Sequence, residues 1–350
     1  MKEYSREILS NPSELVTEGQ INFGCFSNDF KNINFLDANK PFGFPTPRVF
    51  NYLRLKEWQA FQLGNKDYFI LIAVYNAKSI AVNQFILYSK KNKQLFKYEQ
   101  QVPFWKTRIA KNLQDSVSKF AKKNFNIEIV NNLINNIVSL KIDIRKHQKL
   151  PAIKAEFEIN MQNRTGSAIV VSIPFGKNRG MYSFKNLSRV EGVLKHGKTE
   201  IHFEPEDSFS IMDDHKGYYP YNMKYDWVTG AQIQNDELVG FNLTNNQSIN
   251  PEKFNENGLW KGNKLYLLPP VNFLRPNGVD NEWLIRDNYN SVELSFFPEK
   301  HNNFKLNLIA LKSDYSGPFG YFKGFIKYAL GKKIKLDGFF GMGEKKFVRS

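Results

Sequence analysis

The 350-residue sequence has a single cysteine, Cys25. One cysteine excludes a disulfide framework within the chain and any zinc site built from several cysteines. The longest apolar run, from Tyr68 to Tyr75, has the length of a strand and is far shorter than a membrane-spanning helix. The segment Met1 to Glu7 mixes both charges and lacks the apolar core of a signal peptide. These absences predict a soluble protein of the cytoplasm.

Motifs for metal or nucleophilic chemistry are also missing, and the match to a nucleotide-binding pattern lies in the wrong context. The five histidines show no HExxH or HxH spacing, and no GxSxG segment occurs, so no metal site or cofactor is expected. An oxygen-rich metal site around His215 is the minor alternative. Residues 192–199 fit the phosphate-loop pattern GxxxxGK[ST], but the residues that follow alternate like a strand and soon reach Pro205. The segment therefore predicts a β-hairpin turn.

Acidic residues are scarce in the first part of the chain. Residues 1–200 hold 31 basic and 16 acidic residues, which accounts for the whole net charge of +15, while residues 201–350 hold 18 of each. The simplest interpretation is that the lysines keep the protein soluble, and the alternative is an anionic membrane surface as a partner. No nucleic-acid partner is expected. The change in charge places a domain boundary near residue 200.

The abundant residues are aromatic and β-branched, and they alternate with polar ones. The chain has 31 Phe and 16 Tyr, and such residues favour pleated sheets. Period-2 alternation is clear in 140–145, 157–161, 292–296 and 306–310, which predicts strands. Turn residues at 196–197, 262–263 and 331–332 separate such segments as in β-hairpins. Many short strands joined by turns predict a sandwich or barrel.

One segment has a different period. Between residues 107 and 123 the apolar side chains follow helical spacing, with lysines on the other face. The spacing predicts a minor helix over 107–123, either packed on a sheet or lying on a membrane surface. Its apolar positions are Ile109, Leu113, Val117, Phe120 and Ala121.

Ionisable and aromatic side chains are concentrated between residues 213 and 227. Burying so many charges without partners is costly, so the segment either lines a polar site or forms a surface loop. General acid–base chemistry is the option that these residue types support, because an aromatic pocket raises the pKa of a carboxylic acid. The alternative is that they only plug the ends of a barrel. The candidates for proton transfer are Asp213, Asp214, His215, Glu256, Asp287, Asp314 and Glu344, with Arg286 as an anion partner; those for the aromatic wall are Tyr218, Tyr219, Tyr221, Trp227 and Trp283.

The C-terminal half carries an ordered set of motifs: Asp214, Gly217, Tyr219-Pro220-Tyr221, Trp227, Gly230, Glu256-Asn257-Gly258, Trp283 with Arg286, Val292 to Pro298, and Phe319 to Gly324. Together these motifs resemble the DUF2804 family of uncharacterised bacterial proteins. A looser match in the N-terminal half extends the resemblance from about residue 14 to 345. The chain departs from the family at His215-Lys216-Gly217, where a Trp-Gly-Arg-like step is usual, and at Tyr221, where a Trp is more common. The looser match in the N-terminal half lies at Gly24, Pro47, Asn51 and Arg54 to Trp58.

The family in turn resembles the calycin-like double-barrel proteins related to carotenoid 1,2-hydratase and tocopherol cyclase. This resemblance implies an all-β fold of two packed lipocalin-like halves, 1–200 and 201–350. It also implies a hydrophobic or amphipathic small molecule, lipid or isoprenoid-like, bound in a barrel mouth or in the cleft between barrels. Two further hypotheses stay open: an enzyme for acid-initiated hydration or cyclisation, and a peripheral membrane protein. In the enzyme, Asp214 would be the general acid, supported by Glu256, His215 or Arg286.

Overall fold

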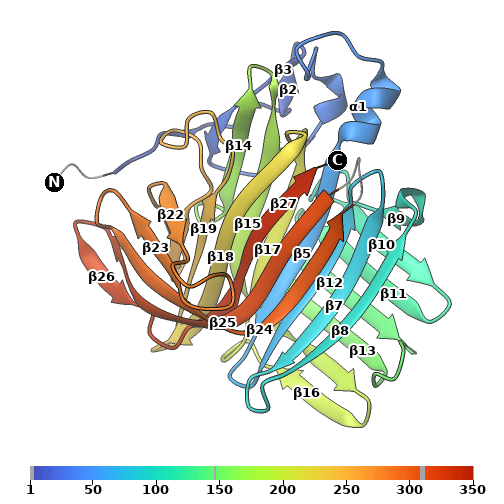
Figure 1. Cartoon of the computed structure of the whole chain (residues 1–350), viewed down its shortest axis with the longest axis vertical. Coiled ribbons are helices and arrows are strands. Elements are labelled where there is room, and N and C mark those ends of the chain that lie inside the picture. The colour runs from blue at the N-terminus through green and yellow to red at the C-terminus, as the bar shows by residue number, and fades with distance from the viewer. Residues whose placement is uncertain (1–3, 146, 308–311, 350) are drawn as a thin grey trace.

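The computed structural model describes residues 4–145, 147–307 and 312–349. In these ranges almost all regular structure is β, arranged as a nearly closed barrel packed against a half-barrel (Figure 1). The all-β prediction of two packed barrel-like halves is therefore confirmed. No helix in the described part of the chain is long and apolar enough to cross a membrane.

The first sheet has the strand order β8-β7-β6-β5-β17-β15-β13-β12-β11-β10-β9, and its neighbours along this path are antiparallel. Strand β13 shows why it curls around a core, since its residues are alternately buried and exposed along its whole length. Its strands are β1 (Ile8–Leu9), β4 (Gly24–Phe26), β5 (Lys56–Gly64), β6 (Tyr68–Asn76), β7 (Ala81–Ser89), β8 (Gln94–Val102), β9 (Thr107–Arg108), β10 (Ser116–Lys122), β11 (Phe125–Asn132), β12 (Ile137–Ile144), β13 (Ile153–Asn160), β14 (Ile169–Gly176), β15 (Arg179–His196), β16 (Thr199–Phe203) and β17 (Phe209–Gly217).

The second sheet has the order β21-β20-β19-β18-β27-β25-β24-β23-β22, and β26 pairs with β25. A short hairpin, β2 (Val16–Thr17) with β3 (Gln20–Ile21), lies outside both sheets. The strands of the second sheet are β18 (Asn222–Gln234), β19 (Glu237–Asn245), β20 (Gly258–Lys261), β21 (Lys264–Leu267), β22 (Val271–Leu274), β23 (Trp283–Asp287), β24 (Val292–Asn307), β25 (Lys312–Tyr328), β26 (Lys332–Lys335) and β27 (Phe340–Arg349).

The apolar core of the described residues is divided into three layers, and one of them joins the two sheets. One fills the inside of the first sheet and includes Phe61, Phe85 and Phe157. Another lies inside the second sheet, around Trp283 and Phe322. The third lies between the sheets, where the outer face of β6 and β7 packs on β25 and β27. In that layer Tyr88 stacks on the ring of Phe340 at 5.1 Å. Because each face of the interface strands is covered, buried polar groups there must find partners inside the protein.

The chain passes from the first sheet to the second between β17 and β18, at residues 218–221. This point lies later than the boundary near residue 200 that the charge pattern suggested, because β17 still pairs with β5 and β15 at the middle of the first sheet. The passage brings the polar segment 213–227 to the surface where the two sheets meet.

The predicted helix over 107–123 is wrong. Those residues form β9, a loop, and β10, which pairs with β11 from Ser116 opposite Asn131 to Lys122 opposite Phe125. Phe120 points into the core of the first sheet and Lys119 to solvent, so the tertiary pairing overrides the helical spacing. The helices of the described residues are instead α1 (Arg48–Arg54) and three short 3-10 helices, η1 (Phe35–Asp37), η2 (Phe104–Lys106) and η3 (Gln162–Arg164).

The strands and hairpins predicted from alternation are largely confirmed. Strand β12 covers 140–144, β13 covers 157–159, and β24 covers 292–296. The predicted turns at 196–197, 262–263 and 331–332 fall within or beside the β15–β16, β20–β21 and β25–β26 hairpins. The segment that fits the phosphate-loop pattern is thus a hairpin. Of the alternating residues at 306–310, Leu306 lies in β24, and Leu308 and Ala310 lie outside the described residues.

Two glycines of the late family motif are required by close backbone approach. A Cβ on Gly320 would lie 2.0 Å from the carbonyl oxygen of Phe297, beside the irregular pairing at Pro298. Gly324 has φ +123° and would meet the carbonyl of Glu293 at 2.1 Å. This part of the motif therefore serves the pairing of β24 with β25.

Candidate functional site

Strand β17 separates the ionisable residues of the central segment into two sets. All nine of its residues are buried, and successive side chains point to opposite faces. Asp213 and His215 face the space between the sheets, whereas Asp214 and Lys216 face the inside of the first sheet. The segment is therefore a buried strand between two environments, and only one of the two sets lines the space between the sheets.

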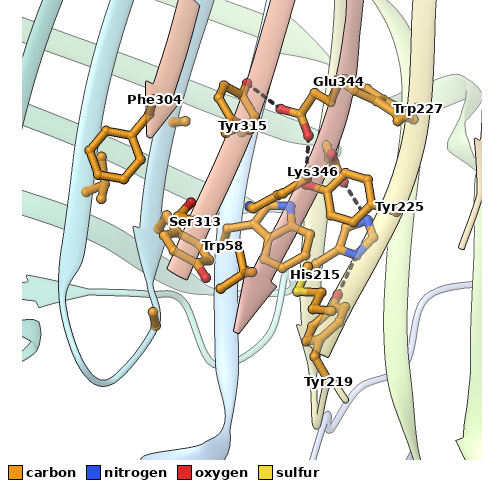
Figure 2. Close-up of a pocket in the computed structure, with 18 of the residues that line it drawn as sticks. Trp58, His215, Tyr219, Tyr225, Trp227, Phe304, Ser313, Tyr315, Glu344 and Lys346 are labelled. Atoms are coloured by element: carbon orange, nitrogen blue, oxygen red, sulfur yellow. Dashed lines mark hydrogen bonds and ion pairs between the residues drawn. The ribbon is translucent and has the colours of Figure 1, made fainter. Parts of the chain in front are cut away.

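A cavity of about 550 Å³ lies between the outer face of β5, β6, β7, β8, β15 and β17 and the facing surface of β18, β24, β25 and β27. Its wall is mainly apolar and aromatic, with Trp58, Tyr219 and Tyr225 among the rings (Figure 2). Small side chains at Ala60 and Ala73 leave room along the first sheet. A concave apolar space with a few polar groups is typical of a small-molecule site.

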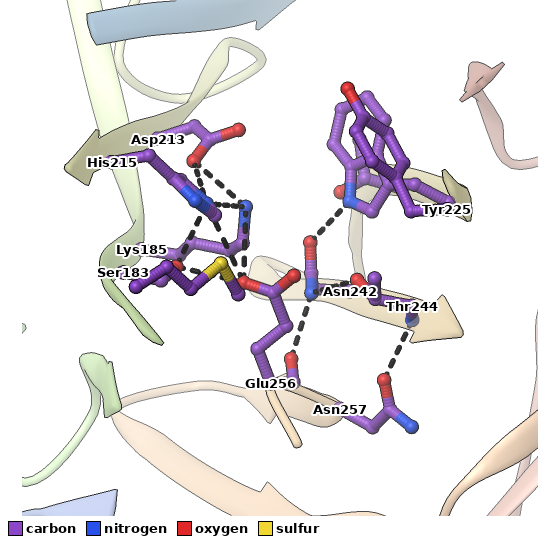
Figure 3. Close-up of polar contacts among 12 residues, drawn as sticks. Ser183, Lys185, Asp213, His215, Tyr225, Asn242, Thr244, Glu256 and Asn257 are labelled. Carbon is purple, nitrogen blue, oxygen red and sulfur yellow. Dashed lines mark hydrogen bonds and ion pairs between the residues drawn. The ribbon is translucent and has the colours of Figure 1, made fainter. Parts of the chain in front are cut away.

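One end of this cavity holds a compact cluster of buried polar side chains (Figure 3). Lys185 Nζ lies 2.8 Å from Asp213 Oδ1, and His215 Nε2 lies 2.9 Å from the same oxygen. Ser183 donates a hydrogen bond of 2.8 Å to Glu256, and its hydroxyl lies 2.9 Å from His215 Nε2. Two carboxylates thus face one ammonium and one imidazole, whose Nε2 also lies 3.2 Å from Lys185 Nζ.

The charges of the cluster stabilise one another. Burial opposes ionisation of Asp213, but Lys185 and His215 outweigh it and hold the pKa of that carboxyl well below its usual range. Burial also opposes the charged form of Lys185, and the carboxylates of Asp213 and Glu256 outweigh it, so the pKa of Lys185 is raised. Asp213 is therefore a carboxylate and Lys185 an ammonium near neutral pH.

His215 connects this cluster to the aromatic wall. Its ring stacks on Trp58 with centroids 4.4 Å apart, and its Nδ1 lies 3.2 Å from the phenol of Tyr219 (Figure 2). Burial, with Glu256 and Asp213 adding to it, raises the pKa of Tyr219 well above its usual value, so its phenol stays protonated. Tyr219, His215 and Asp213 form one chain of polar contacts that begins at the cavity wall.

Glu256 is held in place by the residues around it in the Glu256-Asn257-Gly258 motif. Its backbone carbonyl accepts a hydrogen bond of 2.7 Å from Asn242, which in turn accepts from the indole of Trp227 at 2.6 Å (Figure 3). Asn257 accepts from the backbone of Thr244 and donates to the carbonyl of Pro269. The motif thus fixes the loop before β20, from which the Glu256 carboxylate reaches the cavity.

A second polar group faces the cavity from the other sheet. Glu344 on β27 accepts hydrogen bonds of 2.7 Å from the phenols of both Tyr225 and Tyr315. Lys346, two residues further along the same face, lies among aromatic rings (Figure 2). Burial lowers the pKa of Lys346, and Glu344 opposes this effect. Polar chemistry is therefore available at both walls.

Four of the residues singled out from the sequence line the cavity together: His215, Glu256, Tyr219 and Trp227. Asp213 and Glu344, from the wider group of proton-transfer candidates, lie there as well. These residues come from segments up to about 130 positions apart in the chain, and the meeting of β17, β18 and β27 at the sheet interface brings them together.

The remaining candidates lie elsewhere. Asp214 is fully buried inside the first sheet, 3.7 Å from Lys216 Nζ. Tyr218 donates to the carbonyl of Phe35, and Trp283 lies in the core of the second sheet.

Tyr221 is 51% exposed, and Arg286 donates to the carbonyls of Ile285 and Leu294. Asp287 accepts from backbone groups of its own turn, and Asp314 is exposed.

Sequence reasoning did not find Trp58, Ser183, Lys185 or Lys346. For Lys185 a signal was present, because it shares a face of a long strand with Met181, Ser183 and Leu187. A lysine among such residues in a buried strand needs an ionic partner. No equally clear pattern distinguishes Lys346 from the other lysines of the C-terminal segment. Among the described residues no group of three His, Cys, Asp or Glu side chains is arranged to hold a metal ion.

Several solved structures share this architecture. The chain superimposes on kievitone hydratase from Nectria haematococca with a TM-score of 0.52 at 11% identity, over 94% of this chain and 98% of the other. It superimposes on CghA in complex with Sch210972 with a TM-score of 0.52 at 12% identity, over 84% of this chain and 88% of the other. At such identities the likeness concerns the fold alone.

No curated protein matches the sequence. One family model does match, the domain of unknown function DUF2804, over residues 5–349. The match covers the strands of both sheets and every residue of the cavity described above. The chain is therefore a member of the DUF2804 family.

Proposed function

We propose that the protein is an enzyme that binds a hydrophobic or amphipathic small molecule, lipid or isoprenoid-like, between its two sheets. The reaction proposed is acid-initiated addition of water to a carbon–carbon double bond, or cyclisation of such a substrate. The observation that carries this proposal is the chain Tyr219, His215 and Asp213, which runs from an apolar cavity into a buried cluster of charges. A protein that only binds an apolar ligand has no need for such a cluster.

The cluster can account for both proton transfers of a hydration. The phenol of Tyr219 would give its proton to one carbon of the double bond while His215 passes a proton to the phenol oxygen through Nδ1, so that no free phenolate has to form. The positive charge that develops on the other carbon would face the rings of Trp58 and Trp227. Water then adds to that carbon and loses a proton to Glu256, which is joined to His215 through the Ser183 hydroxyl.

Cyclisation differs only in its last step. A second double bond of the substrate, instead of water, would attack the cationic carbon, and the proton lost from the new ring would go to Glu256. The name of kievitone hydratase, which shares the fold, supports the class of reaction proposed here. A proton donor held in an apolar cavity, with a carboxylate on the same wall, suits both outcomes.

The test starts with the ligand. Apolar compounds that co-purify with the folded protein are extracted and identified by mass spectrometry, and they and unsaturated terpenoids are incubated with the protein in ¹⁸O-labelled water. We expect a product that gains one labelled water molecule, or an isomer of the substrate. Tyr219→Phe and Glu256→Gln should lose at least about 100-fold in rate, whereas Glu200→Gln on the exposed strand β16 should not.

A ligand that binds in the cavity and is released unchanged by the wild type would contradict the proposed enzyme and leave a binding protein. Equal turnover by Glu256→Gln and the wild type would remove Glu256 from the mechanism. To exclude loss of folding as the cause, each variant must keep the melting temperature (Tm) of the wild type within a few degrees.

A further inference from the structure

Lys346 occupies an unusual position in the cavity. Its ammonium lies 5.0 Å from the ring centroid of Tyr75, 5.5 Å from Tyr225, 5.8 Å from Tyr315 and 5.9 Å from Trp58. These rings belong to both sheets, so the ammonium lies where the two walls meet (Figure 2). Aromatic faces attract a cation but accept no strong hydrogen bond from it.

Within the described residues, Lys346 has no carboxylate oxygen within 4.0 Å of its Nζ, unlike two other lysines of the cavity. Lys97 lies 2.9 Å from Glu99, and Lys185 lies 2.8 Å from Asp213. Glu344 shares the face of Lys346 on β27, but the phenols of Tyr225 and Tyr315 occupy its two oxygens. An ammonium carries three N–H donors, so Lys346 needs an acceptor in the cavity.

We propose that Lys346 binds an anionic group of the substrate, a carboxylate or a phosphate ester, while the apolar body of the same molecule lies against the aromatic wall. This inference rests on the proposed function, because it assumes that the cavity binds the substrate. A neutral apolar molecule would displace water from Lys346 and supply no acceptor in return, which is costly. An anion beside Lys346 would also favour its charged form and offset the lowering of its pKa by burial.

The test uses two dyes with the same apolar body, anilinonaphthalene sulfonate, which is anionic, and N-phenyl-1-naphthylamine, which is neutral. The wild type should bind the anionic dye at least about tenfold more tightly. Lys346→Met should lose this preference and still bind the neutral dye. Lys154→Met removes an exposed lysine of β13 outside the cavity, and it should keep the preference.

Binding of the neutral dye with no preference for the anionic one would overturn the inference and leave the cavity as a ligand site. Failure of both dyes to bind would contradict the proposed function as well. Displacement of the anionic dye by decanoate but not by decyl phosphate would assign a carboxylate, and the reverse a phosphate ester. Equal displacement by decanol would again overturn the inference.

A second inference comes from a different part of the surface, the apolar patch around α1 and η2. Large apolar side chains of this patch are strongly exposed, with Trp105 at 69%, Val49 at 66% and Phe44 at 58%. Phe50, Tyr52 and Leu53 are each at least 40% exposed. The ring contact of Tyr52 with Phe104, at 6.4 Å, joins α1 to η2. Figure 1 shows α1 at one end of the molecule, beyond the strands. Such clusters mark interaction surfaces.

The segments that form this patch are mainly basic, although Arg48 on α1 is paired with Asp37 at 3.0 Å. Residues 38–56 and 103–111 contain seven lysines and arginines and no aspartate or glutamate. We propose that the patch docks on a lipid surface with anionic headgroups, with its apolar side chains in the interface and its cations at the phosphates. An interfacial tryptophan and a short amphipathic helix flanked by cations are typical of that mode of binding.

The test is flotation of the full chain with vesicles of phosphatidylcholine alone or mixed with phosphatidylserine. We expect flotation with the anionic vesicles only, and release by high salt. The double variant Val49→Glu/Leu53→Glu should not float, whereas Ile134→Glu, which changes another exposed apolar residue, should behave as the wild type. Absence of flotation of the wild type, or equal flotation of the double variant, would overturn the inference.

Discussion

The buried pair Asp214 and Lys216 gives the sharpest test of how this fold tolerates charge. Both side chains lie inside the first sheet, with 0% and 2% of their surface exposed, and 3.7 Å separates Lys216 Nζ from Asp214 Oδ1. Neither oxygen of Asp214 nor Nζ of Lys216 has a hydrogen-bond partner among the described residues. Burial raises the pKa of Asp214, and Lys216 opposes that effect.

Removal of one partner leaves the other charge buried alone, which typically costs about 3–5 kcal/mol. With an unfolding entropy of about 2.1 cal/mol/K per residue over 350 residues, each kcal/mol lowers Tm by roughly 1.4 °C. Lys216→Met should therefore lower Tm by about 4–7 °C near neutral pH. Replacement of both residues, Asp214→Leu with Lys216→Met, should recover most of this loss because no charge remains buried.

The pH dependence has a definite sign. The pKa of Asp214 is higher in the folded than in the unfolded protein, so protonation of Asp214 stabilises the fold. This stabilisation is present at low pH and is lost as the pH rises through the folded-state pKa. The deficit of Lys216→Met should thus shrink in acid, where Asp214 is protonated. Scanning fluorimetry of the wild type and the two variants measures these shifts. An unchanged Tm in Lys216→Met, or a double variant as unstable as the single one, would refute the reasoning.

Three other outcomes are expected. Asp213 has a lowered pKa, so its contribution to the stability of the fold is present above about pH 4 and is lost as the pH falls. The Tm difference between the wild type and Asp213→Asn should therefore narrow in acid, and a constant difference would contradict this. Gly320→Ala should lower Tm by several degrees, because its Cβ would meet a backbone oxygen. In the control Gly176→Ala the new Cβ would lie 3.7 Å from Arg179 Cβ, an ordinary contact, so Tm should change little, and equal Tm values for the two variants would contradict this. Tyr225→Phe with Tyr315→Phe frees Glu344 to pair with Lys346, so the preference for the anionic dye should fall toward that of Lys346→Met; an unchanged preference would contradict the pairing.

The architecture could be predicted because each sheet buries one face of most strands. Alternation at 140–144 and 292–296 marked the strands directly, and turn residues marked the hairpins. The same rule failed at 107–123, where Ile109 and Leu113 lie in the loop between β9 and β10 and fill the end of the first barrel. Their spacing matched a helix although their burial is set by distant strands.

The site was predicted in part. Its residues were recognised by type, and period 2 places His215 and Asp213 on one face and Asp214 on the other once the segment is known to be a strand. The hypothesis that Asp214 acts as the general acid did not use this rule. Lys185 and Trp58 could not be assigned to the same site from sequence, because strand order in the first sheet decides that they are neighbours of β17.

The position of β27 has a consequence for synthesis of the protein. This strand, formed by residues 340–349, is inserted between β18 and β25 and supplies Met342, Glu344 and Lys346 to the cavity. Until the ribosome has released these residues, β18 and β25 both carry unpaired edges, which promote aggregation. The nascent chain can assemble its first sheet early, but the second sheet stays incomplete until β27 has emerged. Protection by chaperones should matter most in that interval.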